Sequence, residues 1–305
     1  MTSVALNCPW SRLLWLVACV AMSQPVRAGT TPNDPPSHDR ASPMNDPTLA
    51  ESDRATVGRA ATFPALIQDG DAVFFVGNSF FGWQDRKLAE WVAALGKAVT
   101  PPIHIEVGSD IVFGNTPLAG FLDHPATRAA LASRRYKVFV LQGEEFEPVD
   151  HKAAFHQAVR DFQRAICAAG GRTVLFMTWD FRWRPFIAEL AASYDEIGRE
   201  LGIPVIPAGL VYRDCGRSPP HGETPCWLTA DTEHPDGNLH ENERGTAVNA
   251  YVTFAMLTGR NPHGRNFTAP GNTNDDALMR YFSDMAWAEV RPRLPGSDDG
   301  GSSAP

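Results

Sequence analysis

Between residues 72 and 207 the sequence alternates short apolar runs, rich in β-branched and aromatic residues, with longer stretches of helical periodicity. The apolar runs predict strands at 72–76, 103–107, 137–141, 173–177 and 203–207. The helical patterns predict helices at 86–98, within 118–133, and at 153–169, 185–201, 243–257 and 275–289. The runs are apolar almost throughout, as expected when helices cover both faces of a sheet. The alternation therefore predicts an α/β chain with a three-layer αβα, flavodoxin-like parallel sheet of about five strands.

Ligands of such sheets bind beyond the carboxyl ends of the strands, so the residues that follow each strand are the first candidates for chemistry. Ser79 follows the first strand directly. A serine between a buried strand and a helix lies where amide groups and the helix dipole stabilise negative charge. Its own N–H can help to hold an oxyanion. The competing interpretation is a serine that only caps the helix.

The segment 231–245 places two histidines and several acidic residues ahead of a helix. A serine hydroxyl is a weak nucleophile that needs a base, and the base needs an orienting carboxylate. This one segment supplies both. A metal site is the weaker interpretation, because the segment lacks a helical pair of histidines four residues apart. The sequence thus predicts no metal and no organic cofactor.

The sequence contains several short motifs in order: GNSF at 77–80, a glycine-bearing block at 113–118, VLQ at 140–142, MTW at 177–179, IPAG at 206–209, and a closing helix with Tyr251 that ends LTG at 257–259. Together they resemble the SGNH/GDSL hydrolase superfamily, in particular a bacterial branch whose first block reads GNSF. The resemblance covers roughly residues 71–262.

The resemblance implies that Ser79 is the nucleophile and also contributes an oxyanion amide. It implies a second oxyanion N–H from Gly114, and Asn115 could add a side-chain donor. The third block of the superfamily usually offers an asparagine, whereas this chain has Gln142, followed by Gly-Glu-Glu. Gln142 can donate a hydrogen bond, but the ionised carboxylate of Glu144 cannot.

The closing block of the superfamily places an aspartate three residues before the histidine. Asp231 and His234 have that spacing, whereas Asp236 precedes His240 by four residues. We prefer His240 as the base, because it lies five residues before Gly245 and the helix follows at the expected distance. Asp236 is then the expected carboxylate, and His234 and Asp231 are the alternatives.

The two ends of the chain differ in composition from its centre. Residues 1–28 combine Arg12, an apolar run at 13–22 and a small-x-small motif ending at Ala28, which predicts a cleaved signal peptide. The apolar run is too short to span a bilayer comfortably, although an uncleaved anchor is the alternative. Residues 29–66 predict a disordered linker, 67–295 the folded domain and 296–305 a disordered tail. The mature protein is therefore expected in the periplasm or outside the cell, without stable membrane insertion.

Cysteines and charge add two expectations. Cys215 and Cys226 bracket a polar loop and could form a disulfide in an oxidising compartment, while Cys167 is expected to be a buried thiol. A net charge of −8 argues against a nucleic-acid partner, because binding to phosphates needs a basic surface.

Together these features predict an exported serine esterase, a carboxylic ester hydrolase acting through a Ser-His-Asp arrangement. Its substrate would be a small-molecule or carbohydrate ester, either an acetylated carbohydrate or a short-chain acyl ester. Two alternatives stay open: a non-catalytic carbohydrate-binding protein on the same fold, and an acetyltransferase. The oligomeric state does not follow from the sequence.

Overall fold

The computed structural model describes residues 62–181, 183–220, 228–229 and 239–295. Its main sheet has five parallel strands in the order β4-β1-β5-β6-β7. The strands are β1 (Ala72–Gly77), β4 (Glu106–Ile111), β5 (Val138–Leu141), β6 (Arg172–Phe176) and β7 (Val205–Ile206). The order, with the second strand of the sheet placed outside the first, is that of flavodoxin-like sheets. The predicted fold class is confirmed.

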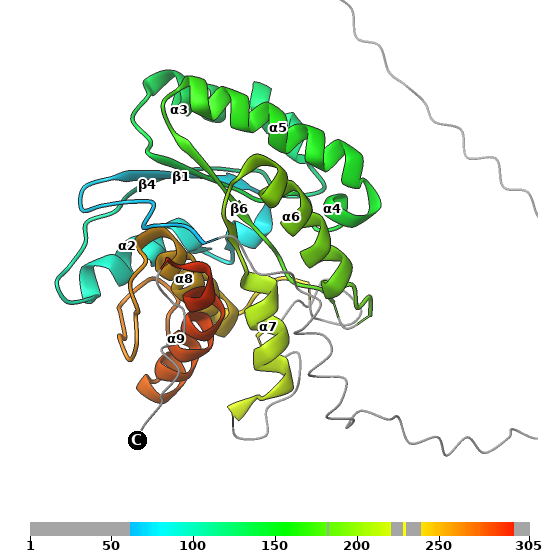
Figure 1. Cartoon of the computed structure of the whole chain (residues 1–305). Helices are drawn as coiled ribbons and strands as arrows, with labels where there is room; N and C mark the ends of the chain where they lie inside the picture. The colour runs from blue at the N-terminus through cyan, green and yellow to red at the C-terminus, as the bar shows by residue number, and fades with distance from the viewer. Residues whose placement is uncertain (1–61, 182, 221–227, 230–238, 296–305) are drawn as a thin grey trace, which may run out of the picture. The chain divides into compact units, whose positions relative to one another are not determined.

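Helices lie on both faces of this sheet. The α-helices are α2 (Leu88–Ala98), α3 (Pro125–Ser133), α4 (Glu147–Asp150), α5 (Lys152–Ala168), α6 (Ile187–Leu201), α7 (Ala208–Arg217), α8 (Glu243–Thr258) and α9 (Asp276–Val290). Short 3-10 helices occur at η1 (Ser79–Phe81), η2 (Leu118–Asp123) and η4 (Arg291–Arg293). In Figure 1, α3 and α5 lie on one face, and α2, α8 and α9 lie on the other. The three layers are those that the sequence predicts.

Burial explains why the central strands are continuous apolar runs. Every residue of β1 and of β5 is buried, because each strand has a neighbour on both sides and helices above and below. Helix α8 is buried from Gly245 to Thr258 and contacts α2, α7 and α9. It therefore lacks the polar face that a surface helix would show.

Some boundaries differ from the predicted ones. Residues 86–87 form the strand β3 (Arg86–Lys87), which pairs in antiparallel fashion with β2 (Gly82–Trp83), so the following helix begins at Leu88. Strand β4 begins at Glu106 and continues to Ile111 instead of covering 103–107. Helix α7 has no counterpart among the predicted elements.

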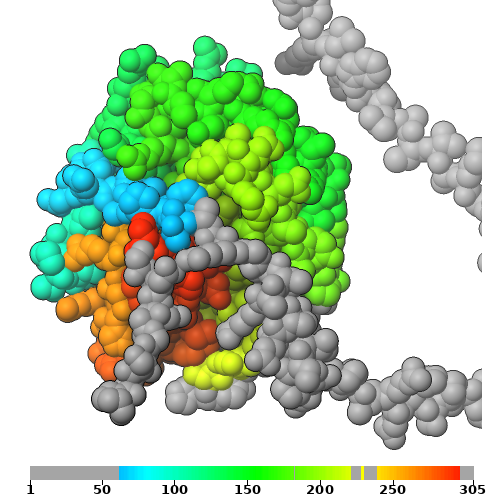
Figure 2. Space-filling model, in the orientation of Figure 1, coloured from blue at the N-terminus to red at the C-terminus, as the bar shows by residue number. Residues whose placement is uncertain are grey.

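The first described residues pack against the end of the domain. Leu66 and Ile67 are buried, and their N–H groups donate to the carbonyl of Leu257 at 2.8 and 3.1 Å. The N–H of Phe63 donates to the carbonyl of Arg293 at 2.9 Å. Figure 2 shows the blue N-terminal segment beside the red C-terminal residues. Packing thus begins before residue 67, the predicted boundary. The predicted signal peptide, residues 29–61 of the predicted linker and the predicted tail lie outside the described residues.

The cysteine expectations have different outcomes. Cys167 is exposed, so the prediction of a buried thiol is wrong. The buried side of α5 runs through Phe162 and Ile166, and the next position along a helix is turned by about 100° from that side. Cys215 is buried, but Cys226 lies outside the described residues, so their pairing stays a prediction.

Within the described residues, none of the helices has the length and apolar content that crossing a bilayer requires.

Candidate active site

Ser79 is the first residue of η1, and Asn78 alone separates it from the end of the buried strand β1. The helix is capped by Asn78, whose side-chain Oδ1 accepts from the N–H of Phe80 at 3.1 Å. The capping role that competed for Ser79 therefore belongs to its neighbour. The Ser79 side chain is therefore available to another partner at the C-terminal ends of the strands.

That partner is His240. Its Nε2 lies 2.7 Å from Oγ of Ser79, although the two residues are 161 positions apart in the chain. This distance is within the range for proton transfer between a nucleophile and its base. The His240 side chain is buried, with 8% of its surface exposed. The other predicted partners, Asp231, His234 and Asp236, lie outside the described residues.

The residues around His240 hold its ring and its backbone. The indole of Trp83 stacks on the imidazole, with ring centroids 3.7 Å apart and an interplanar angle of 5°. Nε1 of Trp179 donates to the carbonyl of Leu239 at 3.2 Å. Trp179 is itself buried and stacks on Tyr212, so it supports residues 239–241, here called the histidine loop, from the core.

Gln142, the predicted oxyanion donor, uses both ends of its amide on the backbone. Its Oε1 accepts from the N–H of Asn78 at 2.9 Å, and its Nε2 donates to the carbonyl of Gly143 at 2.5 Å. Gln142 also packs closely against the backbone of Gly77, where a Cβ would lie only 2.5 Å from Oε1 of Gln142. In this arrangement Gln142 supports the turn that presents Ser79. One of the two Nε2 hydrogens is used on the Gly143 carbonyl, and the predicted role of Gln142 as an oxyanion donor stays a prediction.

The two glutamates after Gln142 are also engaged. Oε2 of Glu144 accepts from the N–H groups of Phe146 and Glu147 at 3.0 and 2.9 Å, so this carboxylate is turned toward the start of α4. Oε2 of Glu145 accepts from Nδ2 of Asn78 at 3.0 Å. Burial raises the pKa of Glu145, and the charge of Glu144 adds to this effect. The neutral form of Glu145 therefore persists to a higher pH than that of an exposed glutamate.

Gly114 and Asn115 lie in the loop after β4, the strand that neighbours β1. Gly114 has φ +96°, a backbone conformation that favours glycine, while the space around its Cβ position is open. Asn115 is exposed. The preceding residue, Phe113, makes an edge contact with Trp83 at 6.4 Å between ring centroids. The loop thus lies next to the residue that stacks on His240, and its donor role stays a prediction.

Two residues that the sequence did not single out lie beside His240. Nη2 of Arg86 donates to the carbonyl of Glu241 at 3.0 Å. The Glu241 side chain is 1% exposed, and its Oε2 has no hydrogen-bond partner among the described residues. Burial raises the pKa of Glu241 well above its ordinary value, and the charge of Arg86 offsets part of this. No motif marks the contact between Arg86 and Glu241, because the two residues are 155 positions apart in the chain.

A second serine–histidine pair has a different setting. Oγ of Ser193 on α6 lies 3.1 Å from Nε2 of His156 on α5, and the same nitrogen lies 3.0 Å from the Ser193 carbonyl. Both residues are buried. Burial also lowers the pKa of His156. The pair joins two packed helices and does not follow a strand, so it serves as an internal comparison for Ser79.

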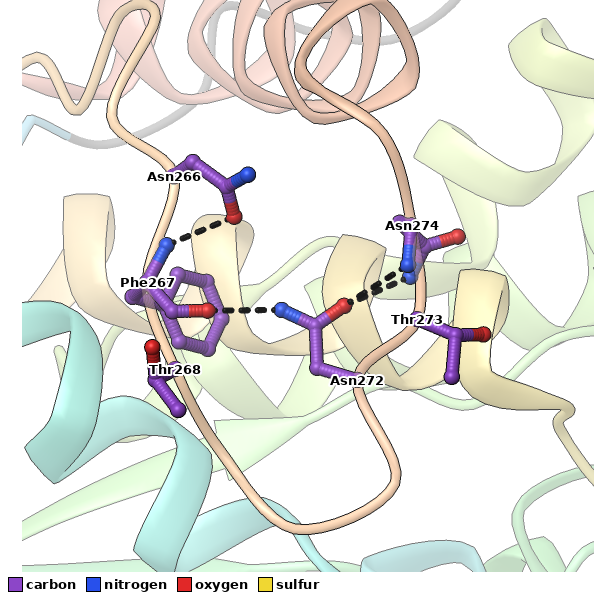
Figure 3. A pocket seen from close by; sticks show the side chains of 6 residues that line it. All are labelled: Asn266, Phe267, Thr268, Asn272, Thr273 and Asn274. Carbon is purple, nitrogen blue, oxygen red and sulfur yellow. Dashed lines mark hydrogen bonds between the residues drawn. The ribbon is translucent and has the colours of Figure 1, made fainter.

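A hollow of about 490 Å³ lies at 266–274 (Figure 3). Its asparagine side chains bind the loop itself: Nδ2 of Asn272 donates to the Phe267 carbonyl, and Oδ1 of Asn272 accepts from Asn274. Nδ2 of Asn266 donates to Asp276. These amides stabilise the loop around the hollow. The serine and histidine that could carry out a reaction, Ser79 and His240, lie instead at the C-terminal ends of the strands. In the parts of the chain that the structure describes, no group of three His, Cys, Asp or Glu residues is arranged to hold a metal.

Comparison with known proteins places the fold. Neither a family model nor a curated protein sequence matches the chain. A DUF4886 family protein from Bacteroides uniformis has a TM-score of 0.53 and 14% identity, over 72% of this chain and 94% of that one. The acetylxylan esterase Axe2 from Geobacillus stearothermophilus has a TM-score of 0.50 and 11% identity, over 63% and 96%. LAE5, an α/β hydrolase from the metagenome of Lake Arreo, has 0.50 and 10%, over 64% and 97%. The predicted resemblance to SGNH hydrolases is confirmed at the level of the fold.

Proposed function

We propose that this chain is a serine esterase in which Ser79 is the nucleophile and His240 the general base. The observation that carries the proposal is the 2.7 Å contact between Ser79 Oγ and His240 Nε2 at the carboxyl edge of the sheet. Asp236 remains the proposed carboxylate partner of His240, with Asp231 as the alternative. His234 is the alternative base.

The reaction would be acyl transfer to water. His240 accepts the Ser79 proton while Oγ attacks the ester carbonyl carbon. The backbone N–H groups of Ser79 and Gly114, with the Asn115 amide, would hold the negative charge that develops on the carbonyl oxygen. His240 then returns the proton to the leaving alcohol, and a water molecule releases the acid from Ser79 in a second step.

Two exposed aromatic side chains favour an acetylated carbohydrate as the substrate. Phe113 is 66% exposed and Trp183 39% exposed, and they are the exposed large hydrophobic residues among the described ones. Phe113 follows β4 and Trp183 follows β6, so they lie on either side of Ser79 along the strand order. Trp183 stacks on Phe181, which contacts Phe80 next to the nucleophile. Separate aromatic faces suit sugar rings, which are apolar on their faces and polar at their edges.

An acetyl-xylooligosaccharide esterase shares this fold, so acetylated oligosaccharides are the first substrates to assay. A short-chain acyl ester is the simpler alternative for the same machinery. Export through the predicted signal peptide would place the enzyme where extracellular or periplasmic carbohydrate is found. The amino terminus of the secreted protein would then be Gly29.

The replacement Ser79→Ala tests the proposal. We expect turnover of a short-chain aryl ester to fall by about 10³-fold or more, because the nucleophile is lost while the fold is kept. Ser193→Ala is the matched control, since it removes a serine that also contacts a histidine, and it should leave turnover unchanged. Equal turnover of the wild type and Ser79→Ala would refute the assignment. Product analysis with sugar acceptors distinguishes transfer of the acetyl group from hydrolysis.

A further inference from the structure

A short hairpin follows the nucleophile directly. Its strands β2 and β3 pair Gly82 with Lys87 and Trp83 with Arg86, and they form a two-stranded sheet separate from the main one. The turn residues Gln84 and Asp85 have φ +50° and +64°. Two consecutive positive φ angles define a tight turn whose twist matches that of the strands. The hairpin is therefore a compact element attached to the end of η1.

The hairpin contacts His240 through the face of an indole. The Trp83 ring is parallel to the imidazole, at 5° and with 3.7 Å between centroids. Its Nε1 is buried and has no hydrogen-bond partner among the described residues, and the indole contacts Phe113 and His240 through its ring. Parallel stacking restricts rotation of the imidazole out of its plane. It keeps Nε2 directed at Ser79.

The other strand of the hairpin holds the backbone after His240. Nη2 of Arg86 donates to the carbonyl of Glu241 at 3.0 Å, and Nη1 donates to Oε1 of Gln84 at 3.3 Å. Arg86 is buried, and its aliphatic stem packs against Gly271, where a Cβ would lie only 3.1 Å from Cγ of Arg86. One element of six residues therefore holds both the ring of His240 and the peptide that follows it.

We propose that the β2–β3 hairpin is a clamp that positions His240 against Ser79, and that the Trp83 indole stabilises the imidazolium formed during catalysis. The inference rests on the proposed function. When the Oγ–carbon bond forms, the Ser79 proton moves to Nε2 and the imidazole becomes a cation. An indole face attracts a cation within about 6 Å of its centroid, and the attraction strengthens when water is excluded. Trp83 and Arg86 are thus positioning residues.

Replacement of Trp83 tests the stacking contact. For Trp83→Leu we expect kcat to fall by about tenfold with KM nearly unchanged, because the indole no longer stabilises the imidazolium that forms in the transition state. The acid limb of the pH–rate profile should move to lower pH, since the neutral imidazole is then relatively favoured. Trp83→Phe, which keeps an aromatic face, should recover part of kcat. Arg86 and Glu241, which lie beside His240, and the proposed carboxylate Asp236 are unchanged in both variants.

Replacement of Arg86 tests the backbone contact. Arg86→Met keeps the apolar stem but removes the donor to the Glu241 carbonyl, so kcat should again fall by about tenfold. Lys87→Ala is the matched control on the same strand, because Lys87 is exposed and pairs with Glu90 instead of the histidine loop. It should retain wild-type kcat. Circular dichroism verifies that each variant is folded.

Tryptophan fluorescence gives a readout that needs no catalytic activity. A protonated imidazole quenches an indole on which it stacks, so wild-type emission should fall on acidification through the titration of His240. Trp83→Phe and His240→Gln should both lose this component. If the wild type hydrolyses esters but Trp83→Leu keeps its kcat and pH profile, the clamp is refuted. If the wild type hydrolyses nothing, the proposed function fails, and the fluorescence titration still decides whether the clamp exists: an unchanged titration in Trp83→Phe refutes it.

Discussion

The hydroxyl of Ser79 lies at a fixed place because the residues before it are held by long-range contacts. The Asn78 N–H is bound by Gln142, and the Asn78 side chain caps η1 while it donates to Glu145. In the proposed reaction, such a network would reduce the reorganisation needed when charge develops at the site. The departure from the usual asparagine at Gln142 thus has a structural use: the longer amide reaches back to the first block.

The buried carboxyl of Glu241 makes stability depend on pH. Burial raises the pKa of Glu241, so the folded chain keeps a proton that the unfolded chain has already lost above its ordinary pKa of about 4.3. Stability from this group is greatest below that pH and declines as pH rises toward the raised pKa, because the unfolded state then binds fewer protons. Glu241→Gln should remove the decline and stabilise the protein by about 1–2 kcal/mol at pH 8.

Denaturant unfolding at pH 5 and pH 8 measures this effect. Glu189→Gln is the control, since Glu189 is exposed on α6, and its pH dependence should match that of the wild type. An equal loss of stability between the two pH values in the wild type and Glu241→Gln would contradict the prediction.

At this scale the sequence predicted the residues that stand in motifs and missed those that support them. Ser79 and His240 were identifiable because each belongs to a recognisable block. The supports Trp83 and Arg86 were not, because stacking and a donor to a backbone carbonyl leave no pattern in a single sequence. The carboxylate candidates lie outside the described residues and stay predictions.

The hairpin shows how far sequence patterns reach for a short element. Its turn is Gln-Asp, whereas two-residue turns of this kind are usually marked by Asn-Gly or Asp-Gly. Residues 86–87 therefore read as the start of the helix that in fact begins at Leu88. Buried strands such as β1 and β5 and amphipathic helices such as α5 and α6 were predicted well, because their pattern is local and is repeated over several residues.

The turn also provides a stability prediction. Asp85 has φ +64°, a conformation that costs a residue with a Cβ about 1 kcal/mol and costs glycine little. Asp85→Gly should therefore raise the free energy of unfolding by up to about 1 kcal/mol and leave the aryl ester turnover intact. Thermal unfolding of the variant measures the change.

Asp123→Gly supplies the control for this substitution. Asp123 is exposed in η2 and is not among the residues with positive φ, so glycine there should only add freedom to the unfolded chain and lower stability. A loss of stability in Asp85→Gly as large as that in Asp123→Gly would show that the turn carries no strain.

At the scale of the whole domain, the first described residues, 62–67, pack against the C-terminal part of the domain. Leu66 and Ile67 are buried against the end of α8, and Phe63 bonds near the last helix. A chain that starts at residue 62 should keep the stability and activity of a chain that starts at Gly29. A chain that starts at residue 69 should lose about 3–6 kcal/mol, because two large aliphatic side chains lose their burial. Urea unfolding compares the two, and equal stability would contradict the packing role of this segment.

The order of elements along the domain was predictable, because alternating strands and helices leave few ways to build a sheet. Residues 62–66 were assigned to the linker because the stretch 29–66 as a whole is rich in Pro, Asp, Ser and Thr, and their packing depends on Leu257 and Arg293, far along the chain. The local sequence pattern therefore predicts the order of strands and helices, whereas contacts between distant segments decide at which residue the packed domain begins.

Covalent labelling of Ser79 tests the central claim most directly. A fluorophosphonate reacts with a serine only when a neighbouring base activates it, so incubation, digestion and mass spectrometry report both the reaction and its position. We predict one label per chain, on the peptide that contains Ser79, absent from Ser79→Ala and strongly reduced in His240→Gln. A folded wild-type protein that takes up no label, or that is labelled at another serine, would contradict the assignment.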